Sequence, residues 1–162
     1  MSPAHGTGHR AEKEAVLKIP ATPSRVFPLF CPERERDWIP GWDCRMAYSA
    51  SGYAEPGCTF VTTSLPEGPT VWTFLEHVLD RHLVIFRVSQ DLVTIRWQMD
   101  LSEPAPGRTE IRMHWVVTGL SAEGNRYIDE VLDRRFADLM ARLETLLTRY
   151  LRAGNLQSAG DG

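Results

Sequence analysis

The chain of 162 residues is 43% hydrophobic and 24% charged, which is typical of one globular domain and excludes a disordered, collagen-like or fibrous chain. Its 18 basic and 21 acidic residues give a formal net charge of -3, so no basic field favours a nucleic-acid partner. Apolar runs end well before the ~20 residues that cross a bilayer, and no secretion signal is visible. Three dispersed cysteines fit neither a disulfide framework nor a zinc site. We therefore expect a cytoplasmic monomer or homodimer with no metal and no cofactor.

The two ends of the chain differ in character from its middle. Residues 1–12 and 154–162 are small, polar and aperiodic, so we expect both to be flexible tails. The domain is expected at residues 13–153. Neither glycine nor proline interrupts residues 71–102 or 126–152, so these stretches should carry most of the regular structure.

Turn residues and hydrophobic patterns predict the elements in chain order. An opening strand is followed by two short helical segments, near 23–27 and 33–37. Strands then follow one another, the longer ones as hairpins. The predicted strands are 15–19, 44–49, 59–64, 71–79, 83–89, 93–102 and 110–117.

The last two predicted strands alternate apolar and polar residues with a period of two. A pairing in which the two residue numbers sum to 212 places Trp97 opposite Trp115 and Met99 opposite Met113. Any pairing with an even sum of residue numbers keeps the apolar sides of the two strands on one face of the sheet. These four side chains are therefore expected on one buried face of an antiparallel sheet.

The final uninterrupted stretch predicts one long amphipathic helix. From Ile128 to Leu151, apolar residues recur with the i, i+3, i+4 spacing of a single stripe, and charged residues cover the other side. Ser121 can cap the start, and Gly154 lies just past the end. This helix is the only element long enough to cover the apolar face of the sheet.

This order of elements, together with three motifs, resembles the START-like (SRPBCC) superfamily, the group of polyketide cyclases/dehydrases and plant pathogenesis-related lipid-binding proteins. The motifs are IPATPSRVF at 19–27, ERERDWIPGWD at 33–43 and TGLSAEGN at 118–125, and the last two resemble stretches of uncharacterised bacterial members. The resemblance covers residues 14–152. It implies a helix-grip α+β fold, in which a curved antiparallel sheet of about six to seven strands wraps around the long C-terminal helix. Members include carriers, receptors, enzymes and chaperone activators, so the fold does not select a function.

The resemblance also implies a cavity between sheet and helix that takes a hydrophobic molecule. The side chains predicted to face inward are bulky aromatics and flexible thioethers, which suit an adaptable apolar pocket. Alternatively, the same side chains simply fill a closed core. The candidate ligand-binding residues are Trp42, Trp72, Phe74, Phe86, Trp97, Met99, Met113, Trp115, Phe136 and Met140.

Trp38 and Trp42 flank a Pro-Gly pair close to the expected mouth of the cavity. They either gate the cavity and touch the ligand, or pin the loop onto the end of the preceding helix. Loops beside a pocket carry function disproportionately, so both interpretations stay open.

Candidate catalytic groups are few, and we name Glu76, Arg45 and Arg87. Glu76 shares the parity of Trp72 and Phe74, so it points inward if its strand has no bulge. Burial would then raise its pKa and suit it to proton transfer. Alternatively, it forms a structural ion pair with Arg87 or Arg45.

Other polar groups are expected on the surface. Glu33, Glu35 and Asp37 are assigned to the solvated side of a short helix, and strand parity turns His77 and His114 outward. We find no nucleophile motif and no metal-ligand spacing.

The sequence leaves three functions open. The first is binding of a hydrophobic aromatic, polyketide-like or lipid-like small molecule between sheet and helix. The second is an enzyme of the cyclase/aromatase type, in which Glu76 and an arginine transfer protons. The third is a protein-interaction module of the chaperone-activator type, which would expose a broad apolar or charged patch. A filled core would exclude the first function, and a cavity wall without titratable groups would exclude the second.

Overall fold

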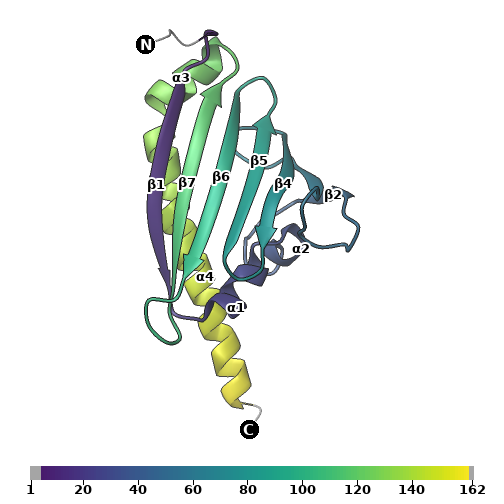
Figure 1. The fold of residues 1–162 in the computed structure, drawn as a ribbon, viewed down its shortest axis with the longest axis vertical. Helices are drawn as coiled ribbons and strands as arrows, with labels where there is room; N and C mark the ends of the chain where they lie inside the picture. Colours follow the sequence, from purple (N-terminus) through teal and green to yellow (C-terminus); the bar gives the residue numbers. More distant parts are fainter. Residues whose placement is uncertain (1–4, 161–162) are drawn as a thin grey trace.

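The computed structural model describes the backbone of residues 5–160 and the side chains of residues 5–154. Seven strands form one antiparallel sheet in the order β1-β7-β6-β5-β4-β3-β2, so the first strand lies beside the last (Figure 1). The strands are β1 (Arg10–Ile19), β2 (Arg45–Tyr48), β3 (Thr59–Thr62), β4 (Thr70–Val78), β5 (His82–Ser89), β6 (Val93–Ser102) and β7 (Thr109–Gly119).

The helices occur in two parts of the sequence, after the first strand and after the last strand. The short segments α1 (Pro23–Val26), η1 (Phe27–Leu29) and α2 (Pro32–Glu35) follow β1, and α3 (Ala122–Glu130) and α4 (Leu132–Gly160) follow β7. Helix α4 crosses one face of the sheet diagonally, and its C-terminal end extends past the sheet (Figure 1). The predicted α+β arrangement, a sheet covered by one long C-terminal helix with short helices after the first strand, is confirmed.

The C-terminal helical region differs from the prediction at both ends. Val131 separates α3 from α4, so two helices replace the single one. Ser121 caps α3 as predicted, because its hydroxyl accepts a hydrogen bond of 3.1 Å from the Gly124 N–H. Helix α4 passes through Gly154 and runs to Gly160. A lone glycine costs a helix only about 1 kcal/mol, and no proline follows it. Residues 161–162 of the predicted tail lie outside the described residues.

The N-terminal segment is tied to α3. Strand β1 begins at Arg10, within the stretch predicted as a tail. The His9 N–H donates to Asn125 Oδ1 at 2.8 Å, and the His9 ring lies 3.0 Å from Asp129 Oδ1. Residues 1–4 of the predicted tail lie outside the described residues.

The predicted pairing of the last hairpin is confirmed. Trp97 lies opposite Trp115, and Met99 lies opposite Met113. All four side chains are buried on the face that α4 covers. The alternation identified this face because the opposite face of both strands carries charged and amide side chains.

Strands β4 and β5 present different residues inward than predicted. Strand β5 buries Leu83, Ile85 and Arg87 toward α4, whereas Phe86 is only half-buried on the outer face. The sequence of β5 is apolar on both faces, so a period of two does not identify its inner side. In β4, a bulge between Phe74 and Glu76 reverses the parity of the residues that follow it.

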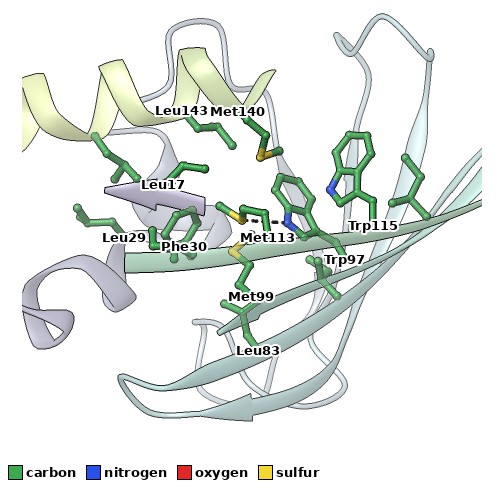
Figure 2. Close-up of a cluster of buried hydrophobic side chains, with 14 of the residues drawn as sticks. Leu17, Leu29, Phe30, Leu83, Trp97, Met99, Met113, Trp115, Met140 and Leu143 are labelled. Carbon is green, nitrogen blue, oxygen red and sulfur yellow. Dashed lines mark hydrogen bonds between the residues drawn. The ribbon is translucent and has the colours of Figure 1, made fainter. Parts of the chain in front are cut away.

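A ladder of aromatic rings joins the sheet to α4. Trp115 is fully buried, with its ring centroid 5.2 Å from that of Trp97 and 5.1 Å from that of Phe136. Figure 2 shows Met140 and Leu143 of α4 directed toward the side chains of the sheet. Its dashed line is the 3.3 Å hydrogen bond from Trp97 Nε1–H to the sulfur of Met113. These contacts hold α4 against β6 and β7. No helix in the described part of the chain is both long and apolar enough to cross a membrane.

Candidate ligand-binding cavity

A cavity of about 180 Å³ lies between the sheet and α4. Strands β3 to β6 supply its floor, α4 covers it, and residues 38–42 and 64–66 close its side. The lining side chains from the sheet are Phe60, Trp72, Phe74, Leu83, Ile85, Arg87, Trp97 and Met99. Those from α4 are Arg135, Leu139, Arg142, Leu143 and Leu146.

Aromatic rings form one continuous wall of the cavity. Phe60 and Trp72 stack with their centroids 5.4 Å apart. Trp42 meets the Trp72 ring edge-on at 6.0 Å, and Trp97 lies 6.5 Å from Trp72 on the other side. This geometry suits a further ring, because aromatic pairs favour offset-stacked and edge-to-face contacts at these separations.

The indole N–H groups of this wall already have acceptors within the protein. Trp38 donates to the Leu29 carbonyl at 2.9 Å, and Trp42 donates to the Pro32 carbonyl at 2.8 Å. Trp72 donates to the Thr62 hydroxyl at 3.0 Å. Trp38 and Trp42 therefore pin their loop onto the preceding helical segments and also line the cavity. The rings offer the cavity apolar surface and no free donor.

The structure brings five of the ten predicted ligand-binding residues to the cavity. Trp42, Trp72, Phe74, Trp97 and Met99 line it. The others lie elsewhere: Met113, Trp115, Phe136 and Met140 are buried in the adjoining core, and Phe86 is on the outer face. The inward orientation predicted for Phe86 is wrong. Strand β5 carries apolar residues on both faces, so its sequence does not show which face is inward.

Glu35 is the acidic group of the cavity wall. It ends helix α2, where its backbone carbonyl accepts hydrogen bonds from Trp38 and Ile39. The side chain keeps some accessible surface because it faces the cavity, but protein surrounds it, and burial raises its pKa to about 8. The predicted solvated position is therefore wrong for Glu35. A carboxyl group with this pKa is mainly protonated at neutral pH and can donate a proton to a bound molecule.

A buried polar network lies beside the aromatic wall. Glu67, in the loop between β3 and β4, accepts hydrogen bonds from the Tyr127 hydroxyl at 2.8 Å and from Arg135 Nε at 2.9 Å. Its Oε1 lies 3.7 Å from Nη2 of Arg87. Burial opposes ionisation of Glu67, but Arg87, Arg135 and Tyr127 together lower its pKa. Glu67 is therefore a buried carboxylate shared by two guanidinium groups.

The catalytic candidates Glu76 and Arg45 lie away from the cavity. An inward orientation of Glu76 required a strand without a bulge, and the bulge in β4 turns this side chain outward. Its carboxylate lies 2.6 Å from His82 Nε2, and Asp100 lies 2.6 Å from the other ring nitrogen. Hydrogen bonds that the protonated ring donates to these two carboxylates raise the pKa of His82. Arg45 is exposed on β2, at the edge of the sheet. Of the three candidates, Arg87 alone lines the cavity.

The same bulge changes the orientation of His77. Its ring centroid lies 4.9 Å from that of Phe27 and 6.1 Å from that of Phe74, so it faces inward against the prediction. His114 lies on the outer face opposite Gln98, as predicted. Among the described residues, no group of three or more His, Cys, Asp or Glu side chains comes close enough to hold a metal ion.

Solved structures share this architecture, although no family model and no curated protein matches the sequence. The Mll3558 protein from Rhizobium loti is 15% identical over 88% of this chain and 98% of its own, with a TM-score of 0.66. An uncharacterized protein from Rhizobium leguminosarum is 16% identical over 89% and 99%, with a TM-score of 0.61. Norcoclaurine synthase from Thalictrum flavum, in complex with dopamine and hydroxybenzaldehyde, is 10% identical over 94% and 95%, with a TM-score of 0.68. This chain shares the helix-grip fold with these solved structures. At these identities, the likeness shows the helix-grip fold alone.

Sequence patterns did not reveal Glu67 and Arg135, two of the charged groups at the cavity. Glu67 lies between Pro66 and Gly68, a context that predicts only an exposed turn. Phe136 belongs to the apolar stripe, and Arg135 directly precedes it and follows another arginine. Its place at the border of that stripe would have been the only signal, because long side chains at such positions reach buried partners.

Replacing Glu35 with glutamine is expected to stabilise the protein at neutral pH. The pKa of Glu35 rises from 4.5 to about 8 on folding, so the folded state holds this proton more tightly than the unfolded chain. The stability that the folded state gains from holding this proton is complete below pH 4.5 and is lost as the pH rises toward 8. We expect Glu35→Gln to be more stable than wild type by on the order of 2 kcal/mol at pH 7, with little difference at pH 4. Urea unfolding between pH 4 and pH 8 measures this change.

Glu33→Gln on the same short helix is the matched control. Glu33 lies at the surface, 3.3 Å from Arg36, and exposed ion pairs of this kind contribute about 0–1 kcal/mol. The control should therefore follow the wild-type pH dependence. A Glu35→Gln variant less stable than wild type at pH 7 would show that the carboxylate has a stabilising partner.

Proposed function

We propose that this protein binds a small aromatic molecule in the cavity between the sheet and α4. The observation that carries the proposal is an unfilled space of about 180 Å³ beside the stacked rings of Phe60 and Trp72 and the edge-on ring of Trp42. The indole N–H groups of Trp42 and Trp72 have partners elsewhere, so a ligand meets ring faces and edges. Burial of apolar surface would drive binding, and a few polar groups would orient the ligand.

The size of the cavity favours one or two fused rings. An engineered apolar cavity of about 150 Å³ holds benzene, whereas pockets for drug-sized molecules span roughly 300–1,000 Å³. A cavity of about 180 Å³ lies close to the smaller value. It therefore favours a compact aromatic ligand over a lipid chain or a multi-ring polyketide.

The comparison with norcoclaurine synthase supports the same class of ligand. That helix-grip protein was solved in complex with dopamine and hydroxybenzaldehyde, two molecules with a single aromatic ring each. The two chains are only 10% identical, so the support concerns the class of ligand and not the reaction.

Filling the cavity should abolish binding. Leu139 of α4 lines the cavity and is only half-buried, so Leu139→Trp would place an indole in the ligand's space while keeping its helical position. With naphthalene-2-carboxamide as the probe, isothermal titration calorimetry is expected to show binding to wild type and at least about tenfold weaker binding to the variant.

Ala137→Trp is the control, because Ala137 is exposed on the same helix. It adds the same ring outside the cavity and should bind the probe as wild type does. Equal affinity of Leu139→Trp and wild type would place the binding site elsewhere. Native mass spectrometry of freshly purified protein would identify the natural occupant as a mass lost on unfolding.

A second candidate function is proton transfer to or from the bound molecule. The observation that favours it is Glu35, a carboxyl group with a pKa of about 8 in the cavity wall. A group that titrates near the working pH can act as general acid in one step and as general base in the next. Glu35 thus replaces Glu76 in the cyclase/aromatase-type alternative, because Glu76 points away from the cavity.

Hydrogen exchange on a carbonyl probe tests this second function. The methyl protons of 2-acetylnaphthalene exchange with deuterium through the enol, which requires proton removal from carbon and proton donation to oxygen. In D2O, NMR should show faster exchange with the wild-type protein than with Glu35→Gln, and Glu33→Gln should match wild type. Equal rates for wild type and Glu35→Gln would exclude a proton-transfer role for Glu35.

A further inference from the structure

The guanidinium of Arg87 is a cation fixed within the wall of the cavity. Arg87 lines the cavity but is only 1% exposed. Its Cζ lies 4.8 Å from the ring centroid of Trp72 and 5.0 Å from that of Trp115. Cation–π contacts of this kind stabilise the charge through the ring faces. They leave the N–H groups at the edge of the guanidinium in need of acceptors.

Two of those N–H-bearing nitrogens have no acceptor. Within the described part of the chain, neither Nε nor Nη2 of Arg87 makes a hydrogen bond. The nearest carboxylate oxygen, Oε1 of Glu67, lies 3.7 Å from Nη2, beyond hydrogen-bond distance. That oxygen already accepts from Tyr127 and Arg135. Buried donors without partners are rare and costly, which makes this site an exception that calls for an acceptor.

The network around Arg87 also carries surplus positive charge. Arg87 and Arg135 contribute two charges, and Glu67 compensates one of them. The pKa of Tyr127 is raised, first by burial and then by Glu67, so its hydroxyl is neutral. Burial lowers the pKa of Arg87, but arginine stays protonated in proteins. One uncompensated positive charge therefore lies beside the cavity.

The remaining charged groups of the cavity wall do not cancel this charge. Arg142, exposed at the α4 side of the cavity, has the same sign. Glu35 is mainly neutral at pH 7, because burial raises its pKa to about 8. A ligand that enters the cavity thus encounters a positive potential from several directions.

We propose that Arg87 receives an anionic oxygen of the ligand, so that the natural ligand is an aromatic monoanion such as an aryl carboxylate. The inference rests on the proposed aromatic-binding function and adds the charge of the ligand to it. The ligand's rings lie against the aromatic wall, and its carboxylate supplies the acceptor that Glu67 does not. Hydrogen bonds between ionised partners are the stronger kind, so the interaction gives both affinity and orientation.

Two probes of nearly the same size and shape that differ in charge test the inference. 2-Naphthoate and naphthalene-2-carboxamide share a ring system and a carbonyl group, but only the first is an anion at pH 7. Calorimetry with the wild-type protein should show at least about tenfold tighter binding of 2-naphthoate. Arg87→Met should remove this preference by weakening 2-naphthoate at least about tenfold, while the carboxamide changes by less than about threefold.

Arg142→Gln is the matched control, because it removes a positive charge at an exposed position of the same cavity. It should leave most of the preference in place, since exposed charges are screened by solvent and salt. Arg87→Met is expected to fold, because Glu67 keeps Arg135 and Tyr127 as partners. The comparison of the two probes on wild type needs no variant, so it decides the charge of the ligand even without that protein.

The outcomes separate this inference from the function on which it rests. Equal or tighter binding of the carboxamide to wild type would overturn the charge assignment and leave aromatic binding intact. Loss of the preference in Arg142→Gln but not in Arg87→Met would overturn the assignment to Arg87. Failure of both probes to bind wild type would overturn the proposed function and the inference together.

Discussion

The buried carboxylate of Glu67 needs partners for its negative charge, and this need constrains how several elements of the structure pack together. Its side chain is fully buried and joins the loop before β4 to Arg87 on β5, Tyr127 on α3 and Arg135 on α4. An ion removed from water is tolerated only where charged and hydrogen-bonding partners surround it. The four elements must therefore approach one another at this point, and that requirement fixes how the C-terminal helices meet the sheet.

The cavity follows from the same arrangement. Near the network, Trp115 and Phe136 fill the space between the sheet and α4. Beside this filled region, Arg135, Leu139 and Leu146 of α4 border an unfilled gap, and the rings of Phe60, Trp72 and Trp97 line it from the sheet. Two groups in this wall lower stability in the absence of a ligand: a carboxyl that burial keeps protonated, Glu35, and a guanidinium with free donors, Arg87. Buried ionisable groups without full compensation are common at functional sites. Here an acid, Glu35, and a cation, Arg87, line the same apolar cavity.

Much of the fold could be predicted from the sequence, because its strongest patterns are unambiguous. Strands β6 and β7 alternate cleanly, so their inner face followed from residue types, and the register assumed for them is the observed one. The apolar stripe of α4 likewise identified its buried side. Prediction failed where the pattern does not identify the inner face. Strand β5 is apolar on both faces, and Arg87 points inward where Phe86 was expected to do so. A bulge in β4 likewise turns His77 inward and Glu76 outward.

The buried carboxyl groups of the site were beyond prediction for a different reason. Glu35 and Glu67 lie in a short helix and a turn, where periodicity is absent and composition suggests solvent. Their burial depends on which distant elements fold over them, and that information resides in tertiary contacts. Four aromatic and thioether residues of the cavity on the sheet, Trp72, Phe74, Trp97 and Met99, were identified beforehand, because large apolar side chains on the inner face of a sheet have few alternatives.

A crystal structure of the protein with 2-naphthoate would test the central claim most directly, namely that the space between the sheet and α4 is a ligand site with a positive end. We expect density for the rings beside Trp42, Trp72 and Trp97, with a carboxylate oxygen within hydrogen-bond distance of Arg87 and α4 in its present place. Density on the outer face of the sheet, or a cavity closed by its own side chains with no ligand inside, would contradict the claim.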